Sequence, residues 1–249
     1  MNIFCTNDDG YLATGIRVLA SAASALGSVT IVAPDREQSA TSHSLTLHHP
    51  LRARRAVDGT WVVDGTPTDC VLLALNELLS DGPDVCVSGI NHGPNMGEDV
   101  LYSGTVAAAM EATVMGIPAV ALSYSGAYHE EIEGWEEVVR GILRSILGRE
   151  GLPADTLFNV NLPAVAPSDV RGIKVTSLGQ RRYADSITRA KDPSGREYFW
   201  IGGGVASWRG AKDSDFQAVE DGWVSVTPLH LDLTNYELLE EIRAWDLML

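Results

Sequence analysis

Two adjacent carboxylates, Asp8 and Asp9, stand near the start of the chain between Asn7 and Gly10. The apolar run Met1–Thr6 before them is typical of a buried strand, and Gly10 ends that pattern. Two carboxylates about 4 Å apart repel each other by ~1 kcal/mol in water and by ~4 kcal/mol at an effective dielectric constant of about 20. A hard divalent cation such as Mg²⁺ or Mn²⁺ would offset this repulsion, because such ions prefer carboxylate oxygens.

The predicted position of the pair supports a metal site. Small and apolar residues recur at helical spacing over Ala13–Leu26, which predicts a helix soon after the pair. Asp8 and Asp9 would then lie in a strand-to-helix loop at the carboxyl end of a strand, where open α/β sheets bind ligands. The alternative is an ordinary loop, since Asp commonly bonds nearby backbone groups and caps helices.

A second polar stretch follows a later strand, predicted at Asp84–Ser88. The segment Ser88–Gly97 is rich in Gly and Asn, so we expect a loop with exposed backbone amides. Ser103 then caps a helix predicted over Val106–Met115, with Thr105 close to the helix start. Free N–H groups and hydroxyls at such a start bind anions. The alternative is a well-capped helix without a ligand.

Strand and helix patterns alternate around these two stretches, which indicates parallel βαβ units and an α/β fold with a mostly parallel sheet. The first turn lacks the Gly-x-Gly-x-x-Gly fingerprint, so we do not expect dinucleotide binding. Thr66 is predicted to cap a helix that runs to about Ser80. The other predicted core elements are strands at Val29–Ala33, Trp61–Val63, Pro118–Ser123, Leu157–Asn161, Ile173–Ser177 and Val224–Thr227, and a helix at Glu130–Leu147.

The composition argues against several functions and locations. The formal net charge of −15 over 249 residues opposes binding to duplex nucleic acid. No apolar run reaches the length of a membrane span, and the N-terminus lacks the pattern of a signal peptide. The 3 cysteines are scattered among apolar residues, as reduced thiols are. We therefore expect a cytoplasmic protein without a membrane partner.

The segment Asp35–Ser44 follows the second predicted strand and is rich in hydroxyls, including that of Ser39. It can reach the acidic pair, although its composition alone favours a solvated loop. His43, His48 and His49 lie in or just after it. Neighbouring side chains of an extended segment point to opposite faces, so we interpret these histidines as ordinary residues and not as ligands of one metal.

The alternation of strands and helices stops at Gln180–Lys212, which is rich in Arg, Gly, Tyr and Trp. A segment this long without a core pattern is usually functional, and Tyr, Trp and Arg are enriched at interfaces. A terminal helix is predicted over Glu237–Trp245. We expect the segment and the helix to form contacts between subunits, and the alternative is a surface loop that contacts nothing.

These features together resemble the SurE family of metal-dependent acid phosphatases, which act as 5′/3′-nucleotidases. The resemblance covers essentially the whole chain as a single domain. It is carried by the motifs Thr6-Asn7-Asp8-Asp9-Gly10, Ser44-Leu45-Thr46-Leu47, Ser88-Gly89-Ile90-Asn91, Gly93-Pro94-Asn95, Tyr102-Ser103-Gly104-Thr105 and Ser225-Val226-Thr227-Pro228-Leu229.

The resemblance implies a set of site residues. One divalent cation per subunit, Mg²⁺ or Mn²⁺, would be held by Asp8, Asp9, Ser39 and Asn91. The phosphate would be bound by Asn95, Ser103, Gly104 and Thr105. The family commonly has Gly after the metal-binding Ser, whereas this chain has Ala40. Because Ala disfavours a positive φ, we expect the backbone of this loop to differ.

The resemblance also implies a Rossmann-like core of three layers. A C-terminal arm and the terminal helix would be exchanged between subunits, which gives dimers and often tetramers. In this chain the core would comprise about 1–178 and 213–230, the arm about 179–212 and the terminal helix about 235–248.

The implied function is hydrolysis of a nucleoside monophosphate by a metal-activated water, with Asp8 or Asp9 as the group that accepts its proton. Two other classes of protein are alternatives to this function, and both use acidic residues for their chemistry. A receiver-like phosphoacceptor domain would use Asp64, and a covalent phosphatase would use an aspartyl nucleophile. Covalent phosphatases of that kind usually space their two carboxylates two residues apart, whereas Asp8 and Asp9 are adjacent.

Overall fold

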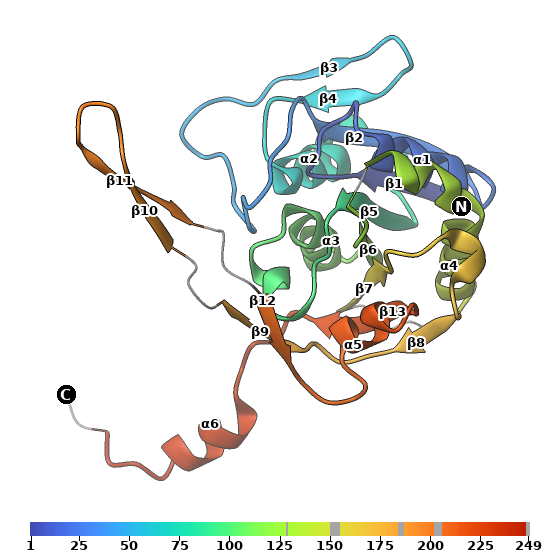
Figure 1. Cartoon of the computed structure of the whole chain (residues 1–249). Helices are drawn as coiled ribbons and strands as arrows, with labels where there is room; N and C mark the ends of the chain where they lie inside the picture. The colour runs from blue at the N-terminus through green and yellow to red at the C-terminus, as the bar shows by residue number, and fades with distance from the viewer. Residues whose placement is uncertain (128, 150–154, 184–186, 202–205, 248–249) are drawn as a thin grey trace.

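A computed structural model describes residues 1–127, 129–149, 155–183, 187–201 and 206–247 (Figure 1). Within these residues a 9-stranded sheet has the order β3-β4-β2-β1-β5-β6-β7-β13-β8. The central strands from β2 to β7 are parallel to their neighbours, and β13 is antiparallel to β7. The prediction of a mostly parallel α/β sheet is confirmed.

The strands of this sheet are β1 (Asn2–Thr6), β2 (Ser28–Pro34), β3 (Ala53–Arg55), β4 (Trp61–Val63), β5 (Val85–His92), β6 (Ala119–Tyr124), β7 (Thr156–Leu162), β8 (Ile173–Val175) and β13 (Val224–His230). The α-helices of the core are α1 (Thr14–Ser24), α2 (Pro67–Leu73), α3 (Gly104–Val114), α4 (Glu136–Leu147) and α5 (Asp215–Glu220). Shorter helical segments are η1 (Ala74–Leu78), η2 (Gly97–Leu101), η3 (His129–Trp135) and η4 (Pro167–Asp169).

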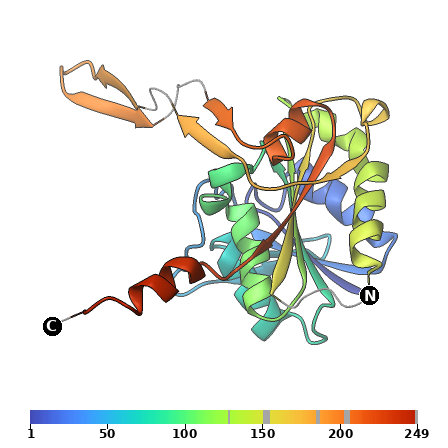
Figure 2. The ribbon, with the colours of Figure 1, turned by 90° about the horizontal axis from the view of Figure 1, so that it is seen from below.

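Helices cover both faces of the sheet, as Figures 1 and 2 show. Helices α1 and α4 pack together on one face, and α2 and α3 pack together on the other. Alternate residues of β1 reach these two layers, with Ile3 and Cys5 in one apolar cluster and Phe4 in the other. The arrangement is the predicted three-layer Rossmann-like core.

Several predicted boundaries are wrong. Strand β5 continues past Ser88 to His92, because the outer residues pair with β6 after a register shift. The helix predicted to reach Ser80 ends at Leu73 and is followed by the π-helical segment η1. The helix predicted over Glu130–Leu147 is divided into η3 and α4.

The predicted arm contains four strands: β9 (Gln180–Tyr183), β10 (Ile187–Lys191), β11 (Glu197–Ile201) and β12 (Ala206–Arg209). Strands β9 and β12 pair beside the core, whereas the β10–β11 hairpin and helix α6 (Tyr236–Ile242) extend away from it (Figures 1 and 2). Residues 184–186 and 202–205 of the predicted arm, and residue 248 of the predicted terminal helix, lie outside the described residues. In the part of the chain that is described, no helix combines the length and the apolar character needed to cross a membrane.

Candidate metal and phosphate site

Asp8 and Asp9 follow β1 after the single residue Asn7, with Asp8 buried and Asp9 half-buried. The carbonyl of Asp8 accepts the N–H of Gln38 at 2.7 Å, and a carboxylate oxygen of Asp9 accepts the N–H of His92 at 3.1 Å. Burial raises the pKa of Asp8 to about 6, a hydrogen bond from Thr105 opposes this rise, and the charge of Asp9 adds to it. A bound cation would stabilise the ionised form of both groups.

Helix α3 begins directly against Asp8. The hydroxyl of Thr105 donates to Oδ1 of Asp8. A Cβ at Gly104 would lie 2.9 Å from both Cβ and Oδ2 of Asp8, so this close approach requires glycine. Ser103 caps the helix by accepting the N–H of Val106 on its Oγ at 3.0 Å. A helix N-terminus that favours anions therefore abuts the predicted metal ligand.

Asn91 lies at the end of β5, opposite Ser123 of the neighbouring strand β6. Its amide Nδ2 donates to the carbonyl of Gly93 at 2.7 Å. This bond fixes the orientation of the amide, so its oxygen remains available as a ligand for a cation. Strand β5 can end close to the acidic loop because Gly15 of α1 has no side chain, and a Cβ there would lie 2.0 Å from the carbonyl oxygen of Ile90.

The segment Asp35–Ser44, here called the hydroxyl loop, approaches the site from the end of β2. Ser39 is exposed and its hydroxyl donates to Glu37 at 2.7 Å. Ala40 and Ser42 have φ values of 58° and 54°. Ala40 therefore adopts the left-handed region that alanine disfavours. The N–H of Ser42 donates to the carbonyl of Tyr102 at 3.1 Å and its hydroxyl to that of Leu101 at 2.6 Å, so contacts with the neighbouring segment hold the strained loop.

Asn95 is held by polar side chains that the sequence reasoning missed. Its Nδ2 donates to Ser123 at 2.8 Å, and its N–H donates to Asn161 at 2.8 Å. Its carbonyl accepts the amides of Asn159 at 2.8 Å and Asn161 at 3.0 Å. Asn159 and Asn161 lie two residues apart on β7 and are fully buried. Polar residues at alternate positions of an otherwise apolar strand are the sequence signal that could have revealed them.

His43, interpreted as an ordinary residue, connects the hydroxyl loop to helix α3. Its Nε2 lies 2.7 Å from a carboxylate oxygen of Glu111, which is buried. No spacing pattern predicts this contact, because the two residues are 68 positions apart. His48 and His49 are exposed, in agreement with their interpretation as ordinary residues.

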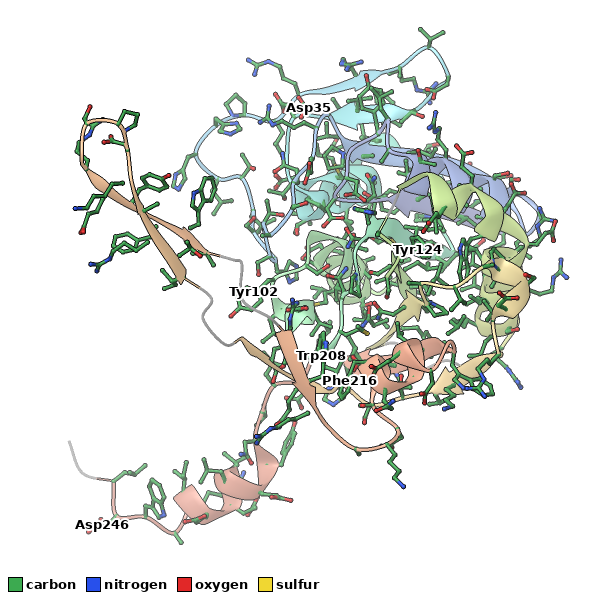
Figure 3. The ribbon with its side chains drawn as sticks, in the orientation of Figure 1. Asp35, Tyr102, Tyr124, Trp208, Phe216 and Asp246 are labelled. Atoms are coloured by element: carbon green, nitrogen blue, oxygen red, sulfur yellow. The ribbon has the colours of Figure 1, made fainter. Side chains whose placement is uncertain are left out.

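Segment η2, which leads into α3, is fixed by a buried carboxylate. Asp215 is 0% exposed and accepts the N–H groups of Gly97 at 2.8 Å, Gly179 at 2.9 Å and Phe216 at 2.8 Å. These contacts join η2 to the start of the arm and to α5. The phenyl ring of Phe216 stacks on Trp208 of β12 with 5.3 Å between the ring centroids. Figure 3 labels the two residues side by side.

A second contact between η2 and the arm is the ion pair of Asp99 with Arg181 of β9. The guanidinium of Arg181 also lies 5.2 Å from the centre of the Trp208 ring. Its charge is therefore compensated by a carboxylate and by the face of an aromatic ring. These contacts place the base of the arm beside the candidate site.

One cavity of about 770 Å³ unites much of the candidate site. The predicted residues in its lining are Asp8, Ser39, Asn91, Asn95 and Ser103. Asp9 faces an adjoining cavity of about 340 Å³, which shares Ser39 and His92 with the first. Gly104 and Thr105 lie behind Asp8, where their close contacts orient its carboxylate.

The donors at this site fit a hard divalent cation. They are carboxylate, amide and hydroxyl oxygens, and within the described residues no three His, Cys, Asp or Glu side chains gather as a metal-binding group. Mg²⁺ and Mn²⁺ accept such an incomplete oxygen shell, since water and substrate oxygens complete it.

Comparisons with known proteins agree with this geometry. The family described as "Survival protein SurE" matches residues 3–185. A protein named 5′-nucleotidase SurE from Gemmatimonas aurantiaca is 58% identical over 248 residues, which is 98% of this chain and 98% of that protein. One of the same name from Geobacter sulfurreducens is 50% identical over 99% of this chain and 94% of its own length.

The crystal structure of SurE protein from Aquifex aeolicus superposes with a TM-score of 0.86 at 42% identity and covers 98% of both chains. With a family match over most of its length, relatives of this identity and a shared architecture, this chain belongs to the SurE family.

Proposed function

We propose that this chain is a divalent-metal-dependent 5′-nucleotidase, which hydrolyses nucleoside 5′-monophosphates, and 3′-monophosphates as a second class, to nucleoside and phosphate. The observation that carries this proposal is the contact between Asp8 and the start of helix α3, which joins a cation site to an anion site. The names of the relatives from Gemmatimonas and Geobacter support the substrate class.

The cation would be held by Asp8, Asp9, Ser39 and Asn91, one Mg²⁺ or Mn²⁺ per subunit. When bound, it would supply Lewis acidity and lower the pKa of water. Thr105 orients Asp8 through its hydroxyl, and Gly104 gives the helix room beside that carboxylate.

The phosphate group would lie between Asn95 and the start of α3. Ser103 uses a lone pair as the helix cap, so its hydroxyl proton remains to donate to a phosphate oxygen. Asn95 is fixed by β6 and β7 and presents the second amide hydrogen of Nδ2. A water would attack phosphorus in line with the ribose oxygen, whose bond to phosphorus breaks. Asp8 or Asp9 would accept the proton of the water, and the released ribose oxygen would take up a proton from solvent.

The receiver-like alternative requires an accessible phosphoacceptor in the site, and Asp64 does not meet this requirement. Its carboxylate accepts the N–H of Arg52 at 2.6 Å and lies 3.8 Å from the guanidinium of the same residue. These contacts connect β4 to the segment before β3. Asp64 is also absent from the lining of both site cavities.

The test is phosphate release from a panel of nucleotides with Mg²⁺, with Mn²⁺ and with chelator. Asp8→Asn and Asp9→Asn should each reduce turnover by at least about 100-fold, because each removes a charged metal ligand. Asp64→Asn is the matched control, with the same chemical change outside the site, and should keep its activity. Near-normal turnover of both site variants at saturating metal contradicts the metal role. A trapped phosphoenzyme would instead indicate a covalent phosphatase.

We also propose a homo-oligomer, a dimer or a tetramer, in which the arm and terminal helix are exchanged between subunits. The hairpin extends away from the core (Figure 1) and carries exposed apolar side chains, which supports a subunit contact there: Ile187, Phe199, Trp200 and Ile201. Three buried free cysteines support a reducing compartment, the cytoplasm.

A further inference from the structure

The site cavity is larger than a metal ion and a phosphate require. Its volume of about 770 Å³ lies in the range of pockets for small organic ligands. Beyond Asn95 and Ser103, its lining continues over Tyr102 and Arg181 to Ile201 at the end of the hairpin strand β11. The phosphate end therefore opens into a space bounded by larger side chains.

Tyr102 is an unusual member of this lining. Tyr102 is 63% exposed to solvent, although it directly precedes Ser103, the proposed phosphate ligand. Among the described lining residues, Tyr102 and His92 carry the only aromatic rings. Figure 3 shows Tyr102 at the edge of the core, on the side from which the β10–β11 hairpin extends.

The backbone of Tyr102 is fixed even though its ring is exposed. Its N–H donates to the carbonyl of Asp99 at 3.0 Å, and its carbonyl accepts the N–H of Ser42 at 3.1 Å. Asp99 is itself paired with Arg181. An aromatic ring on an anchored backbone offers a preformed surface, so a ligand that stacks on it orders little of the chain.

We infer that the ring of Tyr102 stacks on the base of the nucleotide substrate, while Asn95 and Ser103 hold its phosphate. This inference rests on the proposed nucleotidase function and extends it from the phosphate to the nucleoside. An aromatic face stacks on any base, so Tyr102 would select nucleotides over other phosphate esters without selecting one base strongly.

The test compares AMP with ribose 5-phosphate, which carries the same phosphate and sugar without a base. Stacking on an aromatic side chain contributes on the order of 1–3 kcal/mol, and a tenfold effect corresponds to about 1.4 kcal/mol. Because the ring is largely open to solvent, we expect the lower part of this range. Tyr102→Ala should reduce the ratio of kcat/KM for AMP to that for ribose 5-phosphate by about tenfold, and Tyr102→Phe should change it less than about twofold.

Leu101→Ala is the matched control. Leu101 is the neighbouring residue, is 55% exposed and does not line the cavity, so its truncation should leave the ratio unchanged. Equal losses on both esters in Tyr102→Ala, or no loss on either, overturn the inference. If the wild-type protein hydrolyses neither ester, the proposed function itself fails and the inference fails with it.

Discussion

The carboxylate of Asp215 provides a quantitative test of how the site wall is held. In Asp215→Ala, the N–H groups of Gly97, Gly179 and Phe216 lose their acceptor. The two glycines are buried and Phe216 is half-buried. An unsatisfied buried donor costs about 1–3 kcal/mol. Two such donors and a half-buried one should therefore lower the free energy of unfolding by roughly 3–7 kcal/mol.

Asp215→Asn makes the test more specific. The remaining amide oxygen can accept from Gly179 and Phe216, which share Oδ1 in the native protein, but an NH₂ group then faces the N–H of Gly97. We expect the free energy of unfolding to fall by roughly 1.5–3 kcal/mol, because the N–H of Gly97 loses its acceptor and faces another donor.

The assay is urea unfolding followed by circular dichroism at one fixed protein concentration, since an oligomer's stability depends on concentration. Asp213→Asn is the control, because it makes the same charge change at an exposed position two residues before Asp215. If Asp215→Asn and Asp213→Asn agree within about 0.5 kcal/mol, the reasoning about these three N–H groups is refuted.

Four further outcomes are expected from other features of the structure. Thr105→Val should weaken Mn²⁺ binding in calorimetry by roughly tenfold, because Asp8 loses a hydrogen bond of ~1–3 kcal/mol. Thr105→Ser keeps the hydroxyl and should restore the affinity. Equal affinity in the native protein and both variants contradicts this role of Thr105. Gly104→Ala should lower the affinity for Mn²⁺ more than Thr105→Val does, since the new Cβ would lie 2.9 Å from Oδ2 of Asp8. An unchanged affinity would show that the start of helix α3 can move. Burial raises the pKa of the Cys5 thiol to about 12 and raises those of the other two cysteines, so the thiols should stay protonated and react slowly with iodoacetamide from pH 7 to 9 until the protein unfolds. The thermal midpoint should rise with protein concentration if the arm joins subunits, and a protein that scatters light as a monomer at micromolar concentration rules this assembly out.

Local patterns in the sequence predicted the elements with strong apolar runs. Strand β1, helix α3 and the parallel order of the core follow from them, and so does the place of Asp8 and Asp9 after β1. Strand β5 was predicted too short because Gly89 and Asn91 are residue types that strands disfavour. Pairing of Asn91 and His92 with β6 overrides that local preference.

Contacts between distant residues are the part that the sequence could not provide. The partners of Asn95 lie on β6 and β7, and the partner of His43 lies on α3. Each contact joins positions that no periodicity relates. The family resemblance supplied the candidate site residues, but only the three-dimensional structure shows the bonds that orient them.

The left-handed backbone at Ala40 has a consequence for engineering this loop. A non-glycine residue with positive φ costs roughly 1–2 kcal/mol, so replacing Ala40 by Gly would remove strain from the folded state. Glycine would also give the unfolded chain more freedom, which cancels part of that gain. Alanine restricts the backbone beside Ser39, so less conformational entropy would be lost if Ser39 binds the proposed cation. A screen for thermostability that selects glycine at position 40 would therefore favour a loop with less strain over a loop with a more restricted backbone.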